Sequence, residues 1–232
     1  MKHDNSSRGL RTRREVAFAG SAADPAQFPK DRLPEVAFLG RSNVGKSTLL
    51  NALAGTRGLA RVSSAPGRTR LVNFFRMTGV PKPGGRGQGD LYLVDLPGYG
   101  YAKASREVRE TFEKIAVSYL LGSTALRLCV FIVDARHEPG ERDEALRSWL
   151  DHHGLPWALA VNKIDALSKN EARARVAALE AGIGQTASTV LPVSAERGTG
   201  VEELWNAIRG AAFEPPSPEG GVLATRGPDG RC

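Results

Sequence analysis

The sequence has too few cysteines for a disulfide framework or a cysteine-based zinc site. Its 232 residues include only two, Cys129 and Cys232. It also lacks any apolar run that approaches the roughly 18 to 20 residues needed to span a membrane. Arg13 and Arg14 resemble a twin-arginine export signal, but the apolar stretch after them ends at Ser21 and is too short for one. We therefore expect a cytoplasmic protein without a membrane span.

The composition is that of a globular protein with a basic surface. Hydrophobic residues make up 41% of the chain and charged residues 25%, which is enough to bury one substantial core. Lys and Arg outnumber Asp and Glu by 32 to 25, giving a net charge of +7 and an isoelectric point near 9.7. Such a surface attracts polyanions, of which RNA is the first candidate, although charge of this size also serves solubility alone.

Short apolar segments alternate with helical patterns along most of the chain. The segments that predict strands are 35–40, 71–77, 91–95, 126–134, 156–163 and 189–194. The helical patterns cover about 46–55, 105–121, 141–152, 168–181 and 200–211. This alternation predicts an α/β fold with a doubly wound, mostly parallel, six-stranded sheet and helices on both faces. Ligands of such sheets bind beyond the carboxyl ends of the strands.

One motif predicts a phosphate site. "GRSNVGKST" follows the apolar run "EVAFL" and precedes a helical pattern, which is the context that the pattern G-x-x-x-x-G-K-[ST] requires. Gly40 and Gly45 allow a tight loop whose N–H groups face a β-phosphate at the start of the helix. Lys46 then reaches the β- and γ-phosphates, and Ser47 can ligate Mg²⁺. The predicted contact residues are Gly40, Arg41, Ser42, Asn43, Val44, Gly45, Lys46, Ser47 and Thr48.

Two later motifs assign the base as guanine. In "NKID", the carboxylate of Asp165 can accept hydrogen bonds from the N1–H and N2–H₂ groups of guanine, and adenine offers no such pair of donors. Lys163 can lie along the base, and Asn162 can brace the loop against the phosphate site. After the last strand, "VSA" places the N–H of Ala195 where it can donate to guanine O6, with Val193 and Ser194 beside it.

Two loops are predicted to sense the γ-phosphate. "DLPG" supplies Asp95, which would hold Mg²⁺ through water, and Gly98, whose N–H would meet the γ-phosphate, with Leu96 and Pro97 between them. In "APGRTR", Thr69 would ligate Mg²⁺ directly when GTP is bound. The neighbouring contact residues there are Pro66, Gly67 and Arg68. Lys46, Thr69 and Gly98 form the predicted catalytic set.

With its motifs in this order, the chain resembles the translation-factor-like GTPases. "EVAFLGRSNVGKSTLLNAL", "PGRTR", "DLPGYGYAK" and "VDARH" resemble the bacterial EngB (YsxC/YihA) family of ribosome-biogenesis GTPases, over residues from about 16 to 212. The resemblance implies one P-loop G domain that binds GTP and GDP, hydrolyses GTP slowly, and acts in large ribosomal subunit assembly. It also implies a role in normal cell division, including septation. Asn162 and Ala65 stand where the family commonly has threonine.

The resemblance and the composition together divide the chain into three parts. Residues 1–15 are expected to be a basic flexible arm, 16–213 the G domain, and 214–232 a disordered tail with too few apolar residues to pack. The Gly- and Pro-rich segment 80–89 is expected to be a flexible, hairpin-like loop. We expect a monomer.

The residue that follows D-x-x-G predicts slow GTP hydrolysis. In Ras-like enzymes a glutamine at this position orients the attacking water, whereas this chain has Tyr99, whose phenol cannot replace the amide. Asn43 matches the position at which potassium-activated GTPases bind K⁺, but it can equally serve only to organise the loop. Arg68 and Arg70 are alternative sources of a charge-stabilising arginine, and phosphate contact with a partner explains them as well.

Two functional interpretations stay open, and a third is disfavoured. The first is a Mg²⁺-dependent GTPase switch on assembling ribosomes, and the second is a GTP-gated ribosome- or RNA-binding module with negligible turnover. A P-loop kinase is disfavoured by "NKID" and by the lack of an acceptor-site signature. We assign catalysis to none of the histidines, and expect Trp149, Trp157 and Trp205 in or near the core.

Overall fold

We describe the protein from a computed structural model, which covers residues 14–56, 58–59, 71–99, 106–183 and 189–214, with the backbone alone over 106–113. The predicted arm as far as residue 13, the tail from residue 215 and the predicted switch segment 66–70 lie outside these residues. The division of the chain into arm, G domain and tail therefore stays a prediction.

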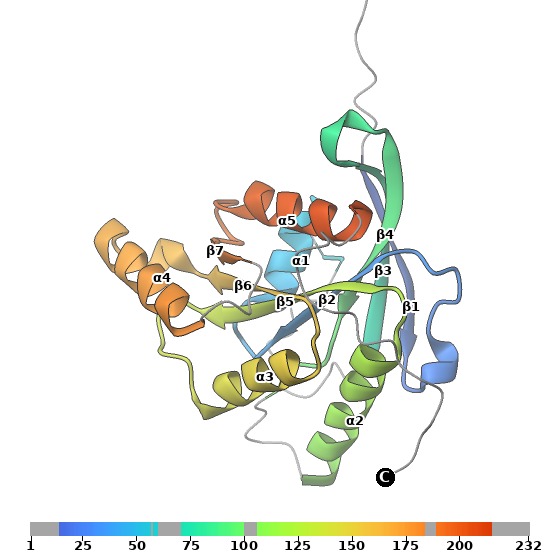
Figure 1. Ribbon diagram of the computed structural model, residues 1–232, viewed down its shortest axis with the longest axis horizontal. Helices are drawn as coiled ribbons and strands as arrows, with labels where there is room; N and C mark the ends of the chain where they lie inside the picture. Colours follow the sequence, from blue (N-terminus) through green and yellow to red (C-terminus); the bar gives the residue numbers. More distant parts are fainter. Residues whose placement is uncertain (1–13, 57, 60–70, 100–105, 184–188, 215–232) are drawn as a thin grey trace, which may run out of the picture.

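A seven-stranded mixed sheet forms the centre of the molecule (Figure 1). Its strands are β1 Glu15–Ala22, β2 Glu35–Gly40, β3 Val72–Pro81, β4 Gln88–Asp95, β5 Leu126–Asp134, β6 Trp157–Asn162 and β7 Val190–Pro192. Their order across the sheet is β1-β3-β4-β2-β5-β6-β7. The contacts of β1 with β3 and of β3 with β4 are antiparallel, and the other four are parallel. The sheet is thus mostly parallel, as predicted.

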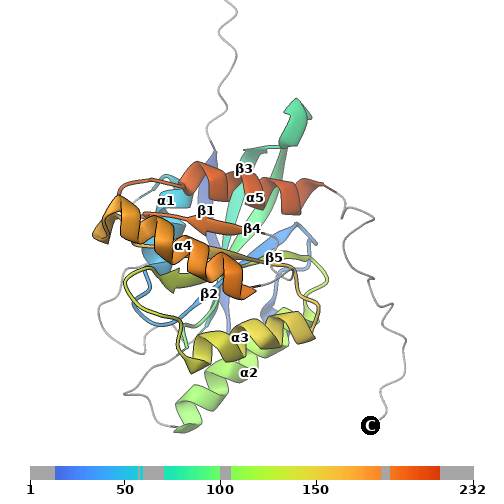
Figure 2. The ribbon, with the colours of Figure 1, turned by 60° about the vertical axis from the view of Figure 1, so that its left-hand side comes forward.

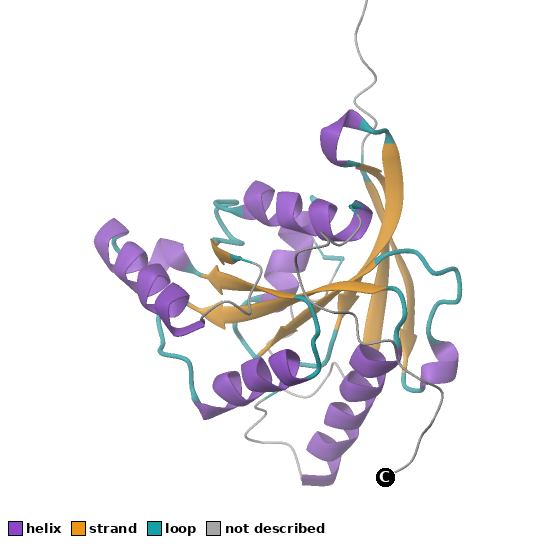
Figure 3. Ribbon diagram, viewed as in Figure 1, coloured by secondary structure: helices purple, strands orange, loops and turns teal. Residues whose placement is uncertain are grey.

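Helices cover both faces of this sheet. The α-helices are α1 Lys46–Ala54, α2 Arg106–Gly122, α3 Glu141–His152, α4 Lys169–Ile183 and α5 Val201–Phe213, with short 3₁₀ turns η1 Pro25–Gln27, η2 Pro83–Gly85 and η3 Ile164–Ala166. α1 and α5 lie on one side and α2 and α3 on the other (Figures 1 and 3). The turned view shows α4 beside the short strand β7 (Figure 2). None of the described helices combines the length and apolar character that crossing a membrane requires.

The two sides of β2 explain why the fold has two core layers. All six residues of this central strand are buried, as expected for a parallel strand covered on both faces. Val36 and Phe38 pack with the apolar residues of α1 and α5, whereas Ala37 and Leu39 pack with those of α2 and α3. Successive side chains of a strand point to opposite faces, so one short sequence serves both layers.

The prediction of six strands was one strand short. β1 forms an antiparallel edge strand on β3 and carries a register shift between Phe18 and Gly20. Most of its side chains are exposed, and Phe18 is 58% exposed. The sequence has a short apolar run at 16–19, but small residues make up most of 17–22 and only Ala22 is buried, so the pattern did not predict a strand there.

The segment 80–89 is a hairpin tip that joins two strands, as predicted, but it is docked on α5, which the sequence did not predict. β3 and β4 extend into it from either side of η2. The Lys82 ammonium lies 5.7 Å from the centre of the Phe213 ring on α5, and the Arg86 guanidinium lies 3.2 Å from the Glu214 carboxylate. A Cβ atom at Gly89 would stand only 2.7 Å from the Phe213 ring, so glycine is required for this close approach.

Candidate nucleotide site

The phosphate-binding loop joins β2 to α1 as predicted. β2 ends at Gly40 and α1 begins at Lys46, and the residue that precedes the helix, Gly45, adopts a left-handed conformation with φ of 93°. No side chain caps this end of α1, so the first N–H groups of the helix are available to an anion. Asn43 also has a positive φ of 70°, which asparagine tolerates better than most residues.

Lys46 and Asp95 form the charged pair next to this loop. The Lys46 ammonium makes an ion pair with the Asp95 carboxylate and donates a hydrogen bond to the carbonyl of Leu96 at 2.7 Å. The two side chains are only 10% and 6% exposed. Asp95 is the last residue of β4 and lies opposite Phe38 in the parallel pairing with β2, so the sheet register brings it to the phosphate loop.

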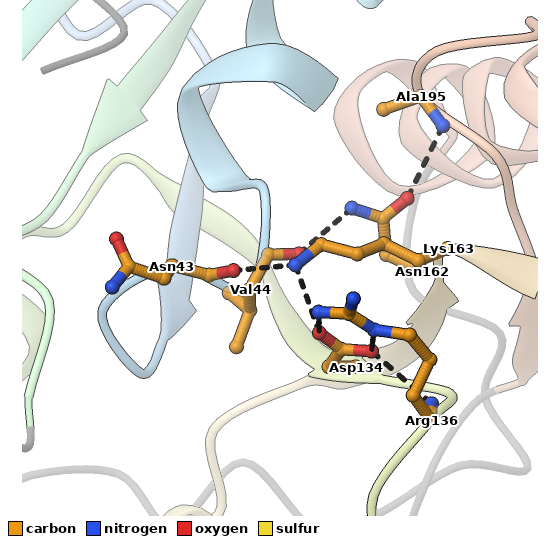
Figure 4. Close-up of polar contacts among 7 residues, drawn as sticks. All are labelled: Asn43, Val44, Asp134, Arg136, Asn162, Lys163 and Ala195. Atoms are coloured by element: carbon orange, nitrogen blue, oxygen red, sulfur yellow. Dashed lines mark hydrogen bonds and ion pairs between the residues drawn. The ribbon is translucent and has the colours of Figure 1, made fainter. Parts of the chain in front are cut away.

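The loop after β6 is hydrogen-bonded directly to the phosphate loop (Figure 4). Asn162 is the last residue of β6 and is 1% exposed. Its side-chain Nδ2 donates to the carbonyl of Val44 at 2.8 Å, and its Oδ1 accepts from the N–H of Ala195 at 3.1 Å. One side chain therefore joins the phosphate loop to both predicted base-binding segments. The sequence predicted the contact of Asn162 with the phosphate loop.

Lys163 makes the second connection to the phosphate loop. Its Nζ donates to the carbonyl of Asn43 at 2.6 Å and to Oδ2 of Asp134 at 2.8 Å (Figure 4). Asp134, the last residue of β5, is directly beside Asn162 in the register of β5 and β6. Burial raises the pKa of the Asp134 carboxyl, but hydrogen bonds from Arg136 and Lys163 outweigh it and hold this pKa below its usual value.

Asp134 was missing from the predicted site. It is the last residue of a predicted strand and part of "VDARH", but no role was predicted for it. Its position could have identified it as a site residue, because the carboxyl ends of adjacent parallel strands meet at one edge of the sheet. Asp134 orients Lys163, and thereby acts on the site through another residue.

The remaining residues that are predicted to bind the base lie around Asn162. Asp165 belongs to η3, and its side chain is 19% exposed, with Arg197 Nε 3.9 Å from its Oδ2. Val193 and Ser194 are fully buried just after β7, and the N–H of Ser194 donates to the carbonyl of Thr199 at 2.9 Å. The strand itself ends at Pro192, two residues earlier than predicted.

Tyr99 is turned toward α3. Its hydroxyl donates to Oδ1 of Asp143 at 2.7 Å, and its backbone N–H donates to the carbonyl of Gly40 at 3.4 Å. Ser42 in turn donates its N–H to the carbonyl of Tyr99 at 3.1 Å. Asp143 was not in the predicted site, since nothing in a helical acidic run marks one carboxylate as an acceptor for a distant tyrosine.

The described part of the chain brings four of the five predicted motifs to one end of the sheet, and the fifth, "APGRTR", lies outside it. Ser47 and Thr48 lie in the first turn of α1, and a Cβ atom at Gly98 would lie 3.4 Å from the carbonyl oxygen of Gly40. Pro66, Gly67, Arg68, Thr69 and Arg70 lie outside the described residues, so Thr69 as a magnesium ligand and the arginines as charge stabilisers stay predictions. The arrangement otherwise suits a nucleotide whose phosphates face α1 and whose base faces the loops after β6 and β7.

Comparisons with known proteins agree with this geometry. Residues 35–163 match the family model described as "50S ribosome-binding GTPase", and residues 118–212 match "Elongation factor Tu GTP binding domain". A "Probable GTP-binding protein EngB" of Anaeromyxobacter sp. (strain K) is 43% identical over 199 residues, covering 86% of this chain and 92% of the relative. The chain belongs to the EngB family of GTP-binding proteins. Another EngB relative, from Koribacter versatilis (strain Ellin345), is 44% identical over 197 residues, covering 84% and 93% of the two chains.

Solved structures place the EngB-family fold among P-loop G domains. The crystal structure of a probable GTP-binding protein engB has a TM-score of 0.59 and 26% identity, over 78% of this chain and all of the other. Era in complex with MgGDPNP and nucleotides 1506–1542 of 16S ribosomal RNA gives a TM-score of 0.63 and 27% identity, over 82% of this chain and 59% of Era. The prediction of a P-loop G domain, and of a GTP-binding switch protein, is thereby confirmed.

Proposed function

We propose that this chain is a Mg²⁺-dependent GTPase that acts in the cytoplasm, as a monomer, as a nucleotide-dependent switch in large ribosomal subunit assembly. The observation that carries the proposal is the double connection made by Asn162 and Lys163 to the carbonyls of Val44 and Asn43. It fixes the segment that carries Asp165 relative to the phosphate loop. In the proposed binding mode, a guanine nucleotide lies with its base at Asp165 and its phosphates at the phosphate loop.

Base specificity has a two-sided test. The Asp165 carboxylate accepts from two donors on guanine, whereas an asparagine amide offers one donor and one acceptor, which match the C2 carbonyl and N1–H of xanthine. Asp165→Asn should therefore lose GDP affinity by at least about 100-fold and gain affinity for xanthosine diphosphate, because a polar group left unpaired costs more than a missing contact. The test is to measure the dissociation constants of GDP and xanthosine diphosphate for the wild type and the variant. Unchanged preference for GDP would contradict the assignment.

The residues beside the phosphate loop are suitable ligands for Mg²⁺. Ser47 lies in the first turn of α1 and offers a hydroxyl, and Asp95 offers a nearly buried carboxylate. When bound, Mg²⁺ would neutralise charge on the β- and γ-phosphates. Lys46 now pairs with Asp95. We propose that its ammonium turns to the phosphates when nucleotide binds, which leaves the Asp95 carboxylate to hold Mg²⁺ through water. Thr69 would be the second direct ligand.

Slow intrinsic hydrolysis follows from the place of Tyr99. Its hydroxyl donates to Asp143, and a phenol lacks the paired donor and acceptor of a glutamine amide, so we expect it not to orient an attacking water. None of the predicted catalytic residues Lys46, Thr69 and Gly98 is assigned that role. The remaining rate then depends on charge stabilisation around the phosphates.

Asn43 is one candidate for supplying that stabilisation through K⁺. Among the described residues, its side-chain amide has no hydrogen-bond partner, while its carbonyl accepts from Lys163. We expect GTP turnover to be faster in KCl than in NaCl. Asn43→Gly is the suitable variant, because glycine keeps the positive φ of this residue and removes only the amide. Equal rates in both salts, or the same salt ratio in the variant, would leave Asn43 with a purely structural role.

The ribosomal part of the proposal is supported by family and charge. The matching family model is described as a ribosome-binding GTPase, the similar protein Era was crystallised with a segment of 16S ribosomal RNA, and this chain carries a net charge of +7. The role in cell division and septation follows the EngB resemblance alone. The test measures GTP turnover in KCl with and without large ribosomal subunits or their precursors, together with co-sedimentation of the GTP- and GDP-bound forms.

A GTP-gated binding module is the second candidate, and Tyr99 is the observation that favours it. GTP-dependent co-sedimentation with stimulated turnover would establish the switch. The same binding without turnover would establish the gated module. If neither form bound the particles while GTP was hydrolysed, the GTPase would stand and the ribosomal role would fall.

A further inference from the structure

Asp143 joins three segments around the phosphate loop. It lies in the first turn of α3 and is 5% exposed. Oδ1 accepts from the hydroxyl of Tyr99 at 2.7 Å, Oδ2 accepts from the N–H of Gly140 at 2.8 Å, and the guanidinium of Arg41 lies 3.6 Å from Oδ2. One nearly buried carboxylate thus contacts the phosphate loop, the residue after D-x-x-G, and the start of α3.

The hydrogen bond from Tyr99 to Asp143 is stronger than one between two neutral groups. A hydroxyl that donates to an ionised carboxylate makes a charge-assisted hydrogen bond. Burial raises the pKa of the Tyr99 hydroxyl, and the hydrogen bond to Asp143 and its charge raise it further, so the hydroxyl stays protonated and donating at physiological pH. Arg41 opposes this shift without reversing it.

Tyr99 also fixes the backbone that carries Gly98. Its N–H and carbonyl are hydrogen-bonded to Gly40 and Ser42 of the phosphate loop, and a Cβ atom at Gly98 would lie 3.5 Å from the backbone nitrogen of Ser42. Gly98 is therefore held against the phosphate loop from both ends of Tyr99, the backbone and the side chain. Only the side-chain end depends on Asp143.

We propose that Asp143 is a positioning residue for the γ-phosphate contact of the switch, acting through the hydroxyl of Tyr99 on the amide of Gly98. The inference rests on the proposed function, in which Gly98 meets the γ-phosphate. GDP lacks that phosphate, so the contribution of Asp143 is specific to the GTP-bound state. This separates a positioning role from a general contribution to stability.

The cleanest perturbation is Tyr99→Phe, which removes one hydroxyl and keeps the ring. We expect the dissociation constant for a non-hydrolysable GTP analogue to rise about tenfold, in line with the loss of a hydrogen bond to a charged group. The kcat for GTP should fall by a similar factor, and the dissociation constant for GDP should stay within about twofold. In an Asp143→Ala background, where the hydroxyl has lost its acceptor, Tyr99→Phe should add less than about twofold.

The chain offers a matched control in another part of the fold. The Tyr119 hydroxyl donates to the buried Glu35 carboxylate at 2.9 Å, on α2 and β2 at the opposite end of that strand from the phosphate loop. Tyr119→Phe removes the same kind of hydrogen bond, and we expect it to lower stability without changing the ratio of GDP to GTP-analogue affinity.

Two outcomes would overturn the proposal. One is Tyr99→Phe with wild-type affinity for the GTP analogue, and the other is an equal loss of affinity for both nucleotides. Neither outcome touches the proposed GTPase function, which fails instead if the wild-type protein shows no turnover with or without ribosomal particles. Even if no turnover is found, the ratio of the affinities for GDP and for the GTP analogue still tests the role of Asp143.

Discussion

Replacing Gly45 by alanine tests whether the connection between the base and phosphate loops stabilises the fold. Gly45 precedes α1 with a φ of 93°, and a Cβ atom there would overlap Nδ2 of Asn162 and come within 3.6 Å of Lys163 Cε. The added methyl group therefore meets the side chain that joins the two loops. Asn162 has no room to stay in place.

The expected loss of stability has two parts. A left-handed backbone conformation costs a residue with a Cβ atom about 1–2 kcal/mol. Displacing the Asn162 amide breaks its hydrogen bonds to Val44 and Ala195, each of which contributes about 1 kcal/mol net. Gly45→Ala should therefore lower the free energy of unfolding by about 3–4 kcal/mol, a large share of the roughly 5–15 kcal/mol of an ordinary domain.

Gly55→Ala is the matched control, measured by urea denaturation of the nucleotide-free protein. Gly55 also has a positive φ, of 64°, at the other end of α1, but a Cβ atom there would have nothing within 4 Å. It carries only the backbone cost, so the two variants should differ by about 2 kcal/mol, and only Gly45→Ala should impair GDP binding. Equal losses, within about 0.5 kcal/mol, would refute the reasoning, because the Asn162 contacts would then contribute nothing.

Three further changes test other parts of the fold. Burial raises the pKa of Glu35 above its ordinary value of 4.5, so its contribution to stability is present below pH 4.5 and lost as pH rises through the raised pKa. In urea titrations between about pH 4 and 8, the free energy of unfolding of Glu35→Gln should therefore increase relative to that of the wild type as pH rises. Trp205→Phe should cost about 2–3 kcal/mol in the same assay, because the indole N–H donates to the buried carbonyl of Leu53 at 2.9 Å. Lys46→Met leaves Asp95 buried without its cation, so calorimetry should show a destabilised nucleotide-free protein and at least about tenfold weaker GDP binding.

The sequence predicted the parts of the fold that periodicity and motif order encode. Central strands such as β2 and β5 are buried on both faces and leave unbroken apolar runs, so their bounds were predicted to the residue. β1 was missed because its sequence is mostly small residues and its side chains are mostly exposed, and the docking of the hairpin tip was missed because it depends on Phe213 and Glu214, far along the chain. Tertiary contacts of this kind have no local signal.

The same distinction holds for the site. Asn162 and Lys163 were predicted from a motif whose spacing encodes their chemistry, and both reach the phosphate loop, their partners there lying 118 and 120 residues earlier in the chain. Asp134 and Asp143 were not predicted, because each acts on the site through another side chain. The register of β5 and β6 and the packing of α3 bring them there, and neither is visible before the fold is known.

These contacts divide the site into two mechanical parts that can be altered separately. Asn162 and Lys163 connect the loop that is predicted to bind the base to the backbone of the phosphate loop, so we expect them to affect GTP and GDP alike. Asp143 and Tyr99 hold the backbone beside Gly98, and in the proposed function this backbone meets only the third phosphate of GTP. Variants of the first pair should therefore weaken GTP and GDP equally, and variants of the second should change the ratio between them. A protein that works as a switch needs this separation, because tight binding alone shifts no equilibrium unless the two nucleotides are bound with different free energies.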